Sequence, residues 1–215
     1  MIPLLHDFSG ETVLVFGGGR VGARKARRFA REARVVVVSP VFVDAEFGDA
    51  ERVRAAPDMG DVAQWIDRVE PALVVAATDD DVVNEAAATA ARERGILVNR
   101  ADEHGERDPG SVVVPATVRD DPVTVAVATG GTSPALSRYL REQVESEFAG
   151  AGEMATLTGE LREELQQRDV SVDDRREAVR AVVRSPAVWK ALDTRSSKPR
   201  QVAVDVIEDV TGEKL

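Results

Sequence analysis

Three glycines at the end of an apolar run could hold the phosphates of a dinucleotide. Residues 17–22 read Gly-Gly-Gly-Arg-Val-Gly and match the spacing G-x-G-x-x-G at Gly17, Gly19 and Gly22. In this motif the first glycine permits a tight turn, the second lets the backbone approach a pyrophosphate, and the third lets a helix pack on the strand. The helix N-terminus adds N–H donors. The stretch therefore predicts dinucleotide binding, and a purely structural turn is the alternative.

The acidic residue that usually holds the ribose of the dinucleotide is missing. Such an Asp or Glu follows the motif by about 20 residues, at the end of the second strand. Here that strand ends in Ser39, Pro40 and Val41, and Asp44 comes only after the proline. Either backbone groups and Ser39 hold the ribose, or the chain accepts NADP. No arginine lies within this turn to bind a 2′-phosphate, which favours NAD.

Polar residues also follow two later strands. Residues 76–84, AATDDDVVN, could contact the cofactor through Thr78, or they could merely start a helix, because Thr78 and Asp79 are good capping residues. Asn99 and Asp102 follow the fourth strand. That position makes Asp102 a candidate general base, whereas a loop carboxylate is ordinarily solvated.

A second glycine pair precedes a helix in residues 128–138, ATGGTSPALSR. Ser133 is the expected N-cap of that helix, and Pro134 suits its first position. The two glycines before the helix could form an anion pocket for a carboxylate. A tight strand-to-helix connection is the alternative.

Apolar strands alternate with helices through the first hundred residues. We expect strands at 12–17, 34–40, 71–80 and 96–102, and helices at 20–32, 61–70 and 81–95. Strands that are apolar on both faces and alternate with helices indicate a parallel sheet covered on two sides. Ligands of such sheets bind at the carboxyl ends of the strands, where the candidate residues lie.

The pattern changes after residue 110. Residues 111–131 look like two strands joined by a turn at 119–122, and a helix then begins at Ser133. From Ala149 onward the chain is expected to be helical, with breaks at Gly159 and at 185–186. The sequence thus predicts an α/β fold, a Rossmann-like parallel sheet with a small β/α dimerisation region and a helical C-terminal domain. The expected boundaries are 1–112, 113–148 and 149–215.

Composition narrows the classes of function. The net charge of −10 argues against nucleic acid as a partner. No apolar run is long enough to span a membrane, and the N-terminus does not resemble a secretory signal, so we expect a cytoplasmic protein. Zero cysteines exclude thiolate metal sites and cysteine nucleophiles. His104 lies close to Asp102, but one histidine beside a carboxylate is a poor metal signal, and we expect no resident metal.

Four segments in this order resemble the precorrin-2 dehydrogenase / sirohydrochlorin ferrochelatase family of siroheme synthesis. They are VLVFGGGRVGARKA, VVAATDDDVVN, VNRAD and PATVRDDPVTVAVATGGTSPALSRYLREQVE. The resemblance covers roughly residues 1–150. It implies NAD as cofactor, precorrin-2 as the tetrapyrrole substrate and sirohydrochlorin as the product. It also implies a homodimer, and it leaves open a second activity that inserts a ferrous or cobalt ion as substrate.

The resemblance also assigns roles to individual residues. It implies cofactor contacts by Arg20 and Val21 in the glycine loop and by Pro40 and Val41 after the second strand, where the family requires no acid. Asp102 matches the family's catalytic aspartate. We expect the remaining cofactor contacts at Gly17, Gly19, Gly22 and Thr78, and the substrate at Asn99, Thr129, Gly130, Gly131 and Ser133.

The expected substrate carries many carboxylates, so local basic residues must offset the acidic charge of the protein. The candidates are Arg20, Arg100, Arg107, Arg138 and Arg141, each with simple solvation as its alternative. Two other functions stay open at this stage. One is a dimeric module that senses a dinucleotide without catalysis, and the other is a tetrapyrrole site that only inserts a metal.

Overall fold

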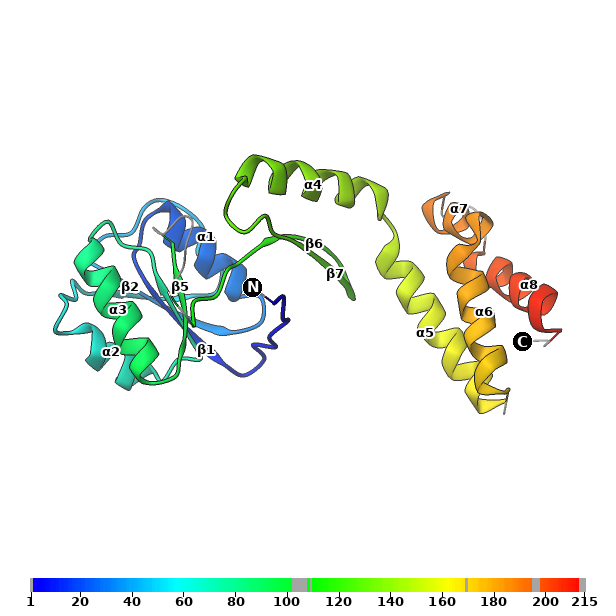
Figure 1. Cartoon of the computed structure of the whole chain (residues 1–215), viewed down its shortest axis with the longest axis horizontal. Coiled ribbons are helices and arrows are strands. Elements are labelled where there is room, and N and C mark those ends of the chain that lie inside the picture. The colour runs from blue at the N-terminus through cyan, green and yellow to red at the C-terminus, as the bar shows by residue number, and fades with distance from the viewer. Residues whose placement is uncertain (1, 102–107, 109, 169, 195–197, 213–215) are drawn as a thin grey trace. The chain divides into compact units, whose positions relative to one another are not determined.

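The computed structural model shows two compact units, Met1–Val114 and Pro115–Leu215 (Figure 1). The residues that the structure describes are 2–101, 108, 110–168, 170–194 and 198–212. The expected three-part division, with boundaries after 112 and 148, stays a prediction.

The first unit is built on a five-stranded parallel sheet in the order β3-β2-β1-β4-β5. Its elements are β1 (Thr12–Phe16), α1 (Arg20–Phe29), β2 (Arg34–Ser39), β3 (Glu51–Arg54), α2 (Val62–Val69), β4 (Leu73–Ala76), α3 (Asp81–Glu93) and β5 (Leu97–Arg100). This order confirms the expected α/β fold. The strand order reverses between β1 and β4, and such a reversal opens a crevice at the carboxyl ends of the strands.

Alternate side chains of the central strands enter two separate cores. Val13 and Val15 of β1 pack with Ala26 of α1 on one face of the sheet. Leu14 and Phe16 pack on the other face, in the core that α2 and α3 complete. Burying one such side chain contributes about 1.5–3 kcal/mol. The sheet is therefore a rigid support for the loops at its carboxyl edge.

Strand β3 is missing from the elements expected from sequence. It reads Glu51-Arg52-Val53-Arg54, and only Val53 packs against a core. A strand with one apolar residue in four has no detectable hydrophobic pattern. It forms because the free edge of β2 is available to it, from Val36 to Ser39. Pattern reading of the sequence therefore missed β3.

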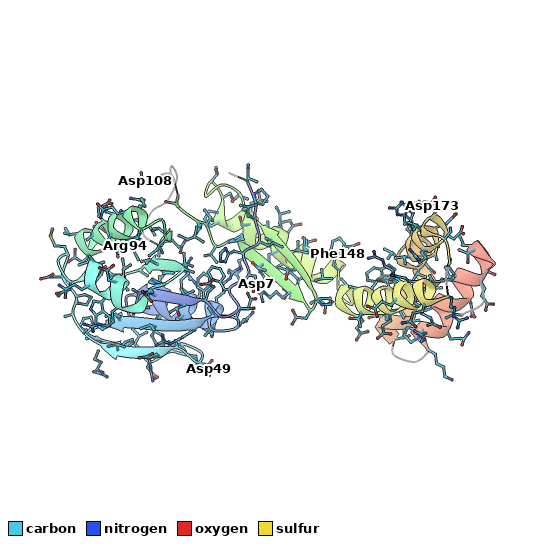
Figure 2. The ribbon with its side chains drawn as sticks, turned by 90° about the horizontal axis from the view of Figure 1, so that it is seen from below. Asp7, Asp49, Arg94, Asp108, Phe148 and Asp173 are labelled. Carbon is cyan, nitrogen blue, oxygen red and sulfur yellow. The ribbon has the colours of Figure 1, made fainter. Side chains whose placement is uncertain are left out.

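The second unit begins with an antiparallel hairpin and continues as helices. Its elements are β6 (Ala116–Asp120), β7 (Val123–Val127), α4 (Pro134–Glu147), α5 (Ala151–Gln167), α6 (Val172–Arg184), α7 (Pro186–Thr194) and α8 (Pro199–Thr211). Helix α4 packs against both strands. Figure 2 shows Phe148 where α4 gives way to α5.

Helices α5 to α8 share one apolar core. Leu157, Leu161 and Leu165 of α5 pack there with residues of the other three helices. The expected break at Gly159 is wrong, because α5 runs through it. An exposed glycine inside a helix costs only about 1 kcal/mol relative to alanine, which this core readily offsets. The break at Ser185 is confirmed, since α6 ends before it and α7 begins at Pro186.

Candidate functional site

The glycine loop, residues 17–22, joins β1 to α1. Neither Gly17 nor Gly22 in this loop could be replaced by another residue without movement. Gly17 has φ +118°, and a Cβ there would lie 2.3 Å from the carbonyl oxygen of Ala77. A Cβ at Gly22 would lie 1.9 Å from the carbonyl oxygen of Gly17. The first glycine therefore makes the turn and the third lets α1 approach it, as the motif predicts.

Gly19 differs from these two glycines because the space beside it is open. It has φ −77° and is the N-cap of α1, with no side-chain hydrogen bond to the helix. A Cβ at this position would meet nothing within 4 Å. The first turn of α1 contains no acidic residue. Free N–H groups, open space and the partial positive charge of the helix end together fit a bound pyrophosphate.

The segment after β2 packs directly on the glycine loop. Val43 donates its backbone N–H to the carbonyl oxygen of Gly18 over 3.0 Å. A Cβ at Gly18 would lie 2.2 Å from the carbonyl oxygen of Val41 and 2.8 Å from Ser39 Oγ. The structure thus brings the predicted contacts at Pro40 and Val41 beside those in the loop. Sequence reasoning missed Gly18, although a glycine between the first two glycines of the motif was a signal for it.

Thr78 lies at the end of β4 and is fixed by a residue of α3. Asn84 is buried, and its Oδ1 accepts a hydrogen bond from the backbone N–H of Thr78 over 3.1 Å. Asn84 Oδ1 also lies 2.7 Å from Thr78 Oγ1, and Asn84 Nδ2 donates to the Thr78 carbonyl over 3.1 Å. Asn84 therefore orients this turn, a role that only its burial inside a helix reveals. The expected cap at Thr78 or Asp79 is wrong, because the side chain of Asp80 caps α3.

Asn99 closes the base of the loop that follows β5. It is 3% exposed, and its Nδ2 donates to the carbonyl oxygen of Val112 over 2.7 Å. The backbone N–H of Val112 in turn donates to the carbonyl oxygen of Val98 over 2.7 Å. Asn99 Oδ1 is buried and has no hydrogen-bond partner among the described residues. Asp102 and His104 lie outside the residues that the structure describes.

Most of the arginines expected to attract substrate carboxylates are already ion-paired. Arg100 is buried and bonds to Glu85. The other pairs are Arg138 Nε with Glu142 Oε1 at 3.0 Å and Arg141 Nη1 with Glu145 Oε2 at 2.6 Å. The hydrogen bond from Arg138 lowers the pKa of the Glu142 carboxyl. Arg107 lies outside the described residues, and Arg20 is exposed at the start of α1.

The turn before α4 uses its polar side chains internally. Thr129 Oγ1 donates to the carbonyl oxygen of Ser133 over 3.0 Å and lies 2.8 Å from Ser137 Oγ. Ser133 Oγ caps α4 by accepting the backbone N–H of Leu136 over 3.3 Å. This cap confirms the expected helix start. The turn belongs to the second unit, whereas the glycine loop and the ends of β2, β4 and β5 belong to the first.

Three further features of the described residues concern a metal site, a membrane-spanning helix and a surface groove. Among them, no three His, Cys, Asp or Glu residues are grouped to hold a metal ion. Within the same residues, no helix is long and apolar enough to cross a membrane. A surface groove of about 440 Å³ lies between α5 and α6, and none of the expected site residues lines it.

The parallel sheet, the glycine loop and the open N-terminus of α1 define a dinucleotide-binding protein of the Rossmann class. The family model for NAD(P)-binding domains matches residues 4–116. The chain belongs to the family of precorrin-2 dehydrogenases and siroheme synthases. It is 32% identical to the precorrin-2 dehydrogenase of Methanosarcina barkeri, over 96% of this chain and 93% of that protein.

Two further comparisons extend this result. The siroheme synthase of Stutzerimonas stutzeri is 32% identical over the whole chain, which spans only 46% of that protein. The solved structure of SirC, a precorrin-2 dehydrogenase, aligns with a TM-score of 0.70 at 22% identity, covering 97% of this chain and all of that one. The match to SirC supports the fold over 97% of this chain.

Proposed function

We propose that this protein oxidises precorrin-2 to sirohydrochlorin with NAD, as a step in siroheme biosynthesis. One observation carries the proposal. A relative named for this activity matches nearly the full chain, and the cradle that its cofactor needs is present at Gly17, Gly19 and Gly22. We also propose that the protein works in the cytoplasm.

The oxidation removes one hydride and one proton from the substrate, so that precorrin-2 and NAD⁺ give sirohydrochlorin, NADH and H⁺. NAD, when bound, supplies the hydride acceptor. The N–H groups at the start of α1 would hold its pyrophosphate, and Arg20, Val21, Pro40 and Val41 would flank it. Asp102 would take the proton, as the resemblance implies. The residues present in the glycine loop fit this cofactor.

The expected substrate residues remain part of the proposal. Asn99 has a buried acceptor, Oδ1, that is unused among the described residues at the carboxyl edge of the sheet. The turn at 129–133 leads into the N-terminus of α4, whose partial positive charge suits a carboxylate. We propose that Thr129, Gly130, Gly131 and Ser133 present this helix end to one carboxylate of the tetrapyrrole.

Turnover is the direct test of this function. Purified protein mixed with precorrin-2 and NAD is expected to form sirohydrochlorin and an equal amount of NADH, followed by absorbance. A folded sample that binds NAD but leaves precorrin-2 unchanged would contradict the proposal. Calorimetry that detects NAD binding without tetrapyrrole binding would instead favour the non-catalytic sensor. Uptake of Fe²⁺ or Co²⁺ by sirohydrochlorin, measured with and without NAD, tests the open chelatase activity.

We also propose that the protein is a homodimer joined through α4 and the β6–β7 hairpin. No residue of α4 is buried, and Leu136 and Tyr139 are 47% and 56% exposed. A two-stranded sheet is marginal on its own and is normally covered by further structure. A second copy would bury the exposed apolar residues of α4, together with Leu140, and would complete this layer.

Charge at the centre of that surface should therefore break the dimer. Tyr139→Glu is expected to shift the mass measured by light scattering from two chains to one, because burying an unpaired carboxylate is strongly unfavourable. Val210→Glu is the matched control, since Val210 is 44% exposed on α8, outside the proposed interface. A wild-type protein that is monomeric at micromolar concentration would refute the proposal.

A further inference from the structure

The free edge of the sheet brings an arginine to the place where the ribose-binding acid is missing. Strand β3 pairs in parallel with β2, and Arg54 is the register partner of Ser39. The backbone N–H of Ala55 donates to the carbonyl oxygen of Ser39 over 3.2 Å, which holds the two strand ends together. Neighbouring strands lie about 4.8 Å apart. Arg54 therefore stands beside the residue at which this class of fold places the adenosine ribose.

The two other arginines of strands β2 and β3 both have partners. The guanidinium of Arg52 lies 5.6 Å from the ring centroid of Phe47. Arg34 Nη2 lies 2.8 Å from Glu51 Oε2 at the opposite end of the same strand pair. Arg54 is exposed, and no carboxylate within the described part of the chain is ion-paired with it. Among the residues that the structure describes, Arg54 therefore has no ion-pair partner at the end of β3.

No acidic side chain closes β2 to oppose an added negative charge. An acid at that position hydrogen-bonds the ribose hydroxyls of NAD and repels the 2′-phosphate of NADP. Here the position belongs to Ser39, whose Oγ donates to the carbonyl oxygen of Val41 over 2.8 Å. The nearest following acid, Asp44, is exposed beyond Pro40.

We propose that this protein binds NADP as well as NAD, and that Arg54 pairs with the 2′-phosphate of NADP. The planar guanidinium suits such a group, because it can donate two parallel hydrogen bonds to phosphate oxygens. The inference rests on the proposed dinucleotide site and adds a phosphate subsite to it. The sequence alone does not predict this subsite. Arg54 is far along the chain from the residues that end β2, and it lies beside them only because β3 pairs with β2.

Calorimetric titration with NADP and with NAD tests the subsite without relying on turnover. Arg54→Ala is expected to raise the Kd for NADP about tenfold to a hundredfold, the usual effect of losing a charge-assisted hydrogen bond, and to change the Kd for NAD less than about threefold. Arg34→Ala removes the same charge at the amino end of β2 and should change neither. Adenosine 2′,5′-bisphosphate and 5′-AMP, titrated in parallel, isolate the contribution of the 2′-phosphate.

The outcomes separate this inference from the proposed function. Wild-type protein that fails to bind NADP, or an Arg54→Ala variant that loses NAD and NADP equally, overturns the phosphate subsite. Arg54→Lys should keep part of the NADP affinity, which guards against a misfolded alanine variant. Oxidation of precorrin-2 with NAD but no NADP binding would leave the function standing and refute the subsite. NADP binding that depends on Arg54, in a protein that does not oxidise precorrin-2, would support the phosphate subsite and contradict the proposed function.

Discussion

Alanine at position 19 is expected to weaken NAD binding about tenfold to a hundredfold while leaving the first unit folded, because it interferes with charge-assisted hydrogen bonds to the pyrophosphate. The added Cβ meets nothing within 4 Å in the protein, and φ at this residue, −77°, suits any amino acid. The methyl group therefore intrudes only on the space at the start of α1. Titration calorimetry measures the affinity, and circular dichroism measures the melting temperature.

Gly22→Ala, unlike Gly19→Ala, should lower the stability of the first unit. Its Cβ would lie 1.9 Å from the carbonyl oxygen of Gly17, so α1 must shift away from the turn and the melting temperature should fall. Gly159→Ala is a control for the substitution itself, because Gly159 is exposed inside α5 and a Cβ there meets nothing. It should leave NAD binding unchanged and raise stability slightly. A Gly19→Ala variant that binds NAD as tightly as the wild type would show that the pyrophosphate lies elsewhere.

The central sheet was predictable because its strands carry strong local signals. Each of β1, β2 and β4 is a run of apolar residues long enough to bury both faces, and the helices between them force parallel pairing. Strand β3 carries no such signal, since its pairing with the edge of β2 determines its structure. The continuity of α5 through Gly159 was likewise decided by packing of Leu157 and Leu161 in the helical core.

The residues of the candidate site also divide into those that local sequence predicts and those that only tertiary structure reveals. The roles of Gly17 and Gly22 follow from spacing, because the turn and the helix contact are local. Gly18, Asn84 and Arg54 became visible only when tertiary structure placed them beside Val41, Thr78 and Ser39. None of these three residues occupies one of the fixed glycine positions of the motif that pointed to the site. A motif therefore predicts where the cofactor binds, whereas strand register and burial identify the residues that surround that position.

The residues leading to Asp102 are held at the carboxyl edge of the sheet. The backbone N–H of Ala101 donates to the carbonyl oxygen of Ala76 over 2.9 Å, which extends the pairing of β4 and β5 beyond the last residue of β5. The bond from Asn99 to Val112 fixes the other end of the same loop. The last described residue before Asp102 thus lies at the edge at which parallel sheets bind their ligands.

Asp102→Asn is expected to lower kcat about a hundredfold to ten-thousandfold, the range that a positioned general base contributes, and to leave the Kd for NAD unchanged. The amide keeps the size of the side chain but cannot accept the proton that precorrin-2 loses. Asp108→Asn is the matched control, because it removes a carboxylate from the same loop. The Asp108 carboxylate forms an ion pair with Arg92 over 2.7 Å and has no proposed role in catalysis. Steady-state formation of NADH gives kcat, and calorimetry gives the affinity. Wild-type turnover in Asp102→Asn would remove this carboxylate from the mechanism, and equal losses in both variants would indicate that the loop needs its charges for structure.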